Sequence, residues 1–76
     1  MSHPIVTEFV ARGRPADDVD RVWAHELAAR VGIVRAAKQV GCSRSSLANV
    51  VAGLSVYPGT CALVREARIR ATDSAA

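Results

Sequence analysis

The chain has 76 residues, 50% of them apolar, and a formal net charge of +3. This length allows one small domain, and the apolar content excludes a chain that is mainly disordered. The aromatic residues are only Phe9, Trp23 and Tyr57, too few for the stacking platforms of RNA and single-strand binders. No apolar run reaches the roughly 18–20 residues of a membrane helix and no secretory signal is evident, so we expect a cytoplasmic protein without membrane contact.

Residues 1–16 are predicted to form an N-terminal extension. Residues 4–12 fit a short helix capped by Ser2, since proline is tolerated in a first helical turn, but the run IVTEFV also alternates like a strand. Residues 12–15, RGRP, interrupt either pattern and are typical of a linker.

A longer helix is predicted from about Asp18 to Val31. Asp17 or Asp18 can cap it, and acidic side chains in its first turn complement the helix dipole. Its expected core contacts form one stripe of Val19, Trp23, Leu27 and Val31. Gly32 is predicted to end the helix, with almost no loop before the next one.

Residues 33–53, IVRAAKQVGCSRSSLANVVAG, indicate two short helices joined by a tight turn at Gly41. Apolar side chains recur at helical spacing on both sides of the turn: Ile33, Ala36, Ala37 and Val40, then Leu47, Val50, Val51 and Leu54. Gly41 stops the first helix because glycine adopts positive φ without a Cβ penalty, and Ser43 can cap the second by accepting an N–H from Ser45 or Ser46. The small Ala37 lets the two helices cross closely, which is the layout of a DNA-reading helix-turn-helix.

The end of the chain is predicted to hold a loop and one more helix. Gly53 ends the second motif helix, and residues 55–59 form a loop with a turn at Pro58–Gly59. The last helix begins near its cap Thr60 and carries Leu63, Val64, Ala67 and Ile69. The main domain is thus placed at residues 17–71, followed by a frayed tail at 72–76.

The sequence offers no pattern for catalysis or metal binding. Cys42 and Cys61 form no CxxC pair and have no clustered histidine, so we expect reduced thiols and no metal site. A P-loop, a dinucleotide-binding turn and a nucleophile elbow are all missing. We therefore expect no enzyme, no catalytic residue, no cofactor and no small-molecule ligand.

Positive charge is concentrated in the second half of the chain. Residues 33–76 carry two carboxylates, Glu66 and Asp73, against a larger set of cations: Arg35, Lys38, Arg44, Arg65, Arg68 and Arg70. Such an excess favours DNA, because neutralised phosphates release their counterions.

The run Ala37, Gly41, Leu47, Val50 and Gly53 resembles the helix-turn-helix core of the lambda-repressor and Cro-like DNA-binding domains, and more distantly that of LacI-type headpieces. The resemblance covers about residues 18–70, and its most specific part is 33–53. It implies an all-α fold, a compact four- or five-helix bundle with the second motif helix in the major groove. Many such domains start the first motif helix with a phosphate-binding Gln, whereas this chain has Ile33, Val34 and Arg35, so Arg35 and Lys38 are the substitutes.

The buried stripe of the second motif helix turns Ser45, Asn49 and Ala52 outward. Arg44 can bond guanine bidentately, and Asn49 can pair with adenine or donate to a phosphate. Ser45 and Ser46 can reach a base edge or the backbone, whereas Ser43 is mainly a cap. The predicted DNA-binding residues are Arg44, Ser45, Ser46, Asn49, Ser43, Arg35, Lys38 and Tyr57.

These features predict a sequence-specific double-stranded DNA-binding regulator, and the resemblance implies a short Cro-like repressor of the kind found in phage and plasmid regions. A homodimer on a palindromic operator is expected, because two half-sites multiply a limited specificity. The dimer contacts come either from Ile5, Val6, Phe9 and Val10 or from Leu63, Val64 and Ile69. The alternatives are a protein-binding helix-turn-helix module, as in an antitoxin or assembly factor, and a DNA-binding recombination accessory protein.

Overall fold

The computed structural model describes residues 13–75, and within them the expected all-α architecture is confirmed. Four helices follow one another: α2 (Asp18–Val31), α3 (Ile33–Val40), α4 (Arg44–Val51) and α5 (Pro58–Ala75). The predictions for residues 4–12, namely a helix or a strand and the apolar set Ile5, Val6, Phe9 and Val10, lie outside the described residues.

Three glycines end the first three described helices. Gly32, Gly41 and Gly53 have φ of 91°, 93° and 79°, a region that L side chains rarely adopt. The Gly32 amide still donates to Ala28 O at 2.9 Å, so the backbone turns away only after the helix is complete. The predicted ends at Gly32 and Gly41 are therefore confirmed, and α2 passes into α3 through a single residue.

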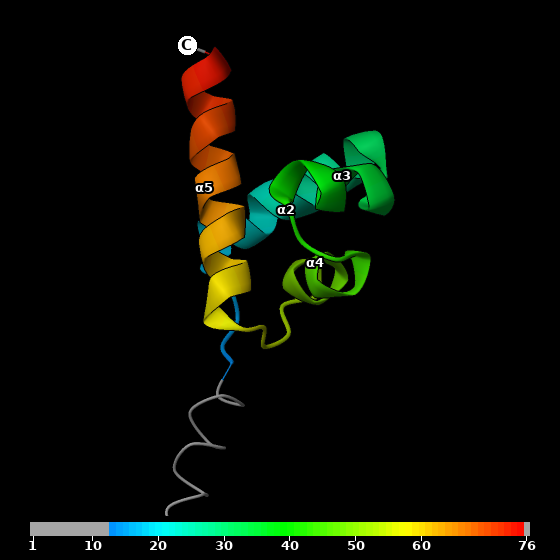
Figure 1. Ribbon diagram of the computed structural model, residues 1–76, viewed down its shortest axis with the longest axis vertical. Helices are drawn as coiled ribbons and strands as arrows, with labels where there is room; N and C mark the ends of the chain where they lie inside the picture. Colours follow the sequence, from blue (N-terminus) through cyan, green and yellow to red (C-terminus); the bar gives the residue numbers. More distant parts are fainter. Residues whose placement is uncertain (1–12, 76) are drawn as a thin grey trace, which may run out of the picture.

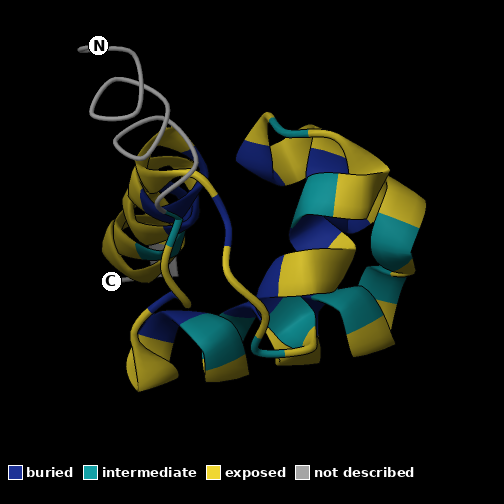
Figure 2. Ribbon diagram, turned by 90° about the horizontal axis from the view of Figure 1, so that it is seen from below, coloured by how far each residue is buried: buried dark blue, intermediate teal, exposed yellow. Residues whose placement is uncertain are grey.

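The core lies between α2, α3 and α4, with α5 packed across them (Figure 1). Figure 2 shows the buried positions turned inward on each helix. The largest fully buried apolar side chains are Leu47 and Val50 of α4 and Val64 of α5. Ala36 and Ala37 of α3 are also buried, and such small side chains permit the close helix crossing that the sequence predicts.

The buried face of α2 agrees with the predicted stripe at Leu27, Trp23 and Val31 and differs from it at Val19. Asp20, Ala24 and Leu27 are buried, whereas Val19 is 58% exposed and Val22 is also exposed. Trp23 and Val31 are half-buried against the edge of the core. Asp20 turns inward because its carboxylate accepts from Arg68 Nε of α5 at 2.5 Å and lies 3.5 Å from Arg65 Nε. A partner so distant in sequence cannot be inferred from helical periodicity.

The C-terminal part also differs in detail. Leu54 was predicted to be buried, but α4 ends at Val51, which leaves Leu54 beyond the helix and 56% exposed. The helix α5 begins at Pro58 rather than near Thr60, because proline at a first helical position loses no hydrogen bond and has a suitable φ. Thr60 is buried, and its amide donates to Tyr57 O at 2.9 Å.

Not all of the predicted apolar side of α5 is covered. Val64 and Ala67 are buried as expected, whereas Leu63 and Ile69 are exposed. The helix continues to Ala75 where a frayed tail was predicted, and its last turns extend beyond the other helices (Figure 1). Among the described helices, none combines the length and apolar character that a membrane span requires.

A short main-chain pairing joins the start of the described chain to the segment before α5. Arg14 N donates to Val56 O at 3.0 Å, and Val56 N donates to Arg14 O at 3.1 Å. The thiol of Cys61 also donates to Arg14 O, at 3.7 Å, and Ala16 is buried. Residues 13–16 therefore pack against the rest of the described fold.

Candidate nucleic-acid interface

The helix α4 is held at both ends by local hydrogen bonds. Ser43 accepts the Ser46 amide at 3.0 Å, which confirms the predicted cap, and the two hydroxyls lie 2.9 Å apart. At the other end, Gly53 N donates to Val50 O at 3.0 Å and Leu54 N to Asn49 O at 2.9 Å, the pattern of a Schellman motif. These caps fix the length and direction of a helix that is too short to be stable alone.

The outward face of α4 is polar and small. Leu47 and Val50 point into the core, which leaves Arg44, Ser45, Asn49 and Ala52 exposed, as the periodicity predicts. Ala48 is exposed as well, and Ser46 is half-buried. An arginine at a helix N-terminus opposes the helix dipole, so the position of Arg44 offers no benefit to the isolated helix. Such a face can donate and accept hydrogen bonds without presenting a large apolar surface.

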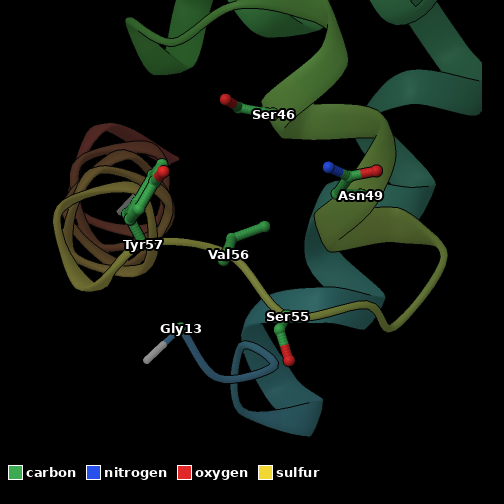
Figure 3. A pocket seen from close by; sticks show the side chains of 6 residues that line it. All are labelled: Gly13, Ser46, Asn49, Ser55, Val56 and Tyr57. Atoms are coloured by element: carbon green, nitrogen blue, oxygen red, sulfur yellow. The ribbon is translucent and has the colours of Figure 1, made fainter. Parts of the chain in front are cut away.

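A hollow of about 310 Å³ lies between α4 and the start of α5 (Figure 3). Ser46 and Asn49 line it from α4, and Tyr57 lies across from them, before Pro58. Ser55, Val56 and Gly13 complete the lining. Hydroxyl and amide groups therefore surround a space beside the exposed face of α4, where an extended polar ligand can be held by hydrogen bonds.

Gly13, Ser55 and Val56 are contributors to this hollow that the sequence did not indicate. Their position depends on the pairing of Arg14 with Val56, which joins residues far apart in the chain. A Cβ built on Gly13 would lie 2.6 Å from Val56 O, so this close approach requires glycine. The RGRP run signals a break in regular structure, but nothing in it indicates what Gly13 contacts.

The predicted cations do not all remain available to a ligand. Arg65 Nη2 lies 2.8 Å from Asp17 Oδ2, and Arg68 pairs with Asp20, so both arginines hold α5 against α2. By contrast, Arg35, Lys38 and Arg44 are exposed and make no ion pair within residues 13–75. Of the predicted DNA-binding residues, the cations that remain available to a ligand are thus two on α3 and one at the start of α4.

Both cysteines lie in the described part of the chain and are free. Cys42, in the turn before α4, is half-buried and free, and burial raises the pKa of its thiol. Cys61 is free and buried. Within residues 13–75 no three side chains of the types that ligate metals come together.

No family model, curated protein or solved structure matches this chain.

Proposed function

We propose that the chain is a sequence-specific double-stranded DNA-binding regulator in which α3, the turn at Gly41 and α4 act as a helix-turn-helix of the lambda-repressor type. The observation that carries the proposal is the exposed, polar face of α4, from Arg44 to Ala52, on a helix that is capped at both ends. A protein-binding face of the same size would be expected to carry aromatic or large apolar side chains at its centre.

In this proposal α4 lies in the major groove. Arg44 bonds guanine O6 and N7, and Asn49 bonds adenine N6 and N7 or a phosphate. Ser45 and Ser46 reach base edges or backbone oxygens, and Ser43 remains mainly the cap. Arg35 and Lys38, three residues apart on the exposed side of α3, neutralise phosphates, and Tyr57 donates to the backbone from the far wall of the hollow.

The regulator acts as a homodimeric repressor that occludes a promoter. One helix as short as α4 reaches few base pairs, so two copies on a palindromic site supply the needed selectivity. Repression by occupancy needs no effector domain, which suits a domain of this size.

The experiment is a selection of bound duplexes from a random library, followed by fluorescence anisotropy on the selected and a scrambled duplex over a salt series. Arg44→Ala/Asn49→Ala is expected to reduce the discrimination between the two duplexes by about 1–3 kcal/mol for each base that the variant no longer reads. The matched control, Lys38→Ala/Gln39→Ala, likewise removes one cation and one carboxamide, here from the exposed side of α3. This control should weaken binding to both duplexes by the same factor. It should also reduce the number of counterions released on binding, read from the slope of log K against log salt concentration, by about one.

Two results would contradict the proposal. One is wild-type binding that does not distinguish the selected from the scrambled duplex. The other is a selectivity that survives Arg44→Ala/Asn49→Ala. Because all four substituted side chains are exposed, circular dichroism should show unchanged helix content in both variants, so weaker binding cannot be attributed to unfolding.

A further inference from the structure

A second surface of the molecule combines apolar and charged side chains, and none of its residues belongs to the candidate nucleic-acid interface. We name it the Trp23 surface: Val19, Val22 and Trp23 of α2, with Arg68 and Thr72 of α5. These residues line a hollow of about 510 Å³ together with Asp18 and Glu26. Trp23 borders two further hollows, of about 260 Å³ and 700 Å³, so its ring is approached from several sides.

The apolar part of this surface has the spacing of a buried helix face. Val19, Val22 and Trp23 recur as core positions do, yet the chain buries Asp20, Ala24 and Leu27 of the same helix instead. Val19 and Val22 are thus left exposed within residues 13–75, beside Trp23, which is half-buried against the edge of the core. Exposed apolar side chains next to a half-buried tryptophan are typical of protein contacts.

The charges around Trp23 indicate the kind of partner. Glu26 lies on α2 beside Trp23, and Arg70 lies on α5 at another of the hollows that Trp23 borders. Both side chains are exposed and make no ion pair within the described residues. In a twofold contact, residue i of one copy meets residue j of the other and the reverse, so Glu26 of each copy can meet Arg70 of the other.

Two ion pairs join α5 to α2 next to this surface. The Asp17–Arg65 and Asp20–Arg68 pairs fix α5 against the first turns of α2, at 2.8 and 2.5 Å. A preformed surface loses less conformational entropy on association than a mobile one.

We propose that two copies of this chain associate through the Trp23 surface, with the two tryptophans near the twofold axis and Glu26 of each copy facing Arg70 of the other. This proposal shares the expectation of a homodimer with the proposed function. Its test contains no DNA, so either proposal can fail without the other.

The test is sedimentation equilibrium of the full chain together with tryptophan fluorescence over a dilution series. Trp23 is the single tryptophan, so its emission reports on this surface alone. The wild type should show a mass approaching two chains and a blue-shifted emission at high concentration, and both should disappear on dilution. Val19→Glu should raise the dissociation constant at least tenfold. The matched control is Val34→Glu, the same change at the second residue of α3, where the valine is 49% exposed.

A charge exchange tests the orientation of the two copies. Glu26→Arg and Arg70→Glu should each weaken the dimer, and the double variant should restore it, because every Glu–Arg contact is re-formed in reverse. A wild-type mass of one chain at all concentrations would overturn the proposal. A dimer that Val19→Glu weakens no more than Val34→Glu would overturn it as well.

Discussion

Asp20 is a carboxylate in the core, 1% exposed, and it decides which side of α2 faces inward. Its two oxygens are approached by Arg68 Nε and Arg65 Nε, so the buried charge is compensated by side chains from α5. Burying a carboxylate is costly unless it is paired and hydrogen-bonded. The pairing therefore allows α2 to bury Asp20 while two valines stay at the surface.

Replacing Asp20 by alanine should destabilise the fold by about 3–5 kcal/mol, because Arg68 would be left partly buried without its partner. The free energy of unfolding in urea measures this effect. Asp17→Ala is the control: its pair with Arg65 is exposed and should contribute no more than about 1 kcal/mol. If the two variants lost the same free energy of unfolding, the buried pair would contribute no more to stability than the exposed one.

At the scale of the helices, the features that could be predicted from the sequence are those determined by residues close together in the chain. The ends of α2 and α3 at Gly32 and Gly41 and the cap at Ser43 are local signals, and each is present. Of the predicted stripe of α2, Leu27 is buried and Trp23 and Val31 pack against the core, so only Val19 was wrong. The inward turn of Asp20 was missed because its pairing is long-range. The predicted start of α5 was wrong because Pro58 serves as well in a first helical turn as in a loop.

The same division applies to the candidate interface. The outward face of α4 follows from its apolar stripe, so the exposure of Arg44, Ser45 and Asn49 could be predicted. The hollow beside them could not, since two of its walls come from Gly13 and Val56, which meet only in the folded chain. Whether these residues contact DNA stays a prediction.

The turn between α3 and α4 requires glycine at position 41 because of its backbone conformation, not because a side chain there would clash with a neighbour. Its φ is 93°, and a Cβ there would meet no atom within 4 Å. Gly41→Val should therefore cost about 1–3 kcal/mol from backbone strain alone, measured as a lower urea midpoint. Gly59→Ala is the control, because Gly59 lies in the first turn of α5 with open space around it and alanine favours helix. An unchanged midpoint for Gly41→Val would contradict this account of the turn.

For the molecule as a whole, the pairing of Arg14 with Val56 connects the start of the described fold to the wall of the hollow. Gly13→Ala should disrupt it, since the new Cβ would lie 2.6 Å from Val56 O. We expect faster hydrogen exchange at the Arg14 and Val56 amides, with the amides of α3 unchanged. Gly59→Ala should leave all of these amides as they are in the wild type. Unaltered exchange at Arg14 and Val56 in the Gly13 variant would show that the backbone accommodates the extra carbon.

The Arg14–Val56 pairing also has a consequence for the order in which the chain folds. It closes a loop that contains α2, α3 and α4. Closing a long flexible loop early in folding lowers the chain entropy before other contacts have formed to offset that loss. Once those three helices have packed on one another, residues 14 and 56 are already brought near, and the remaining search is short. We therefore expect the two main-chain hydrogen bonds between Arg14 and Val56 to form late in folding. In unfolding they should break first, while α2, α3 and α4 remain packed on one another.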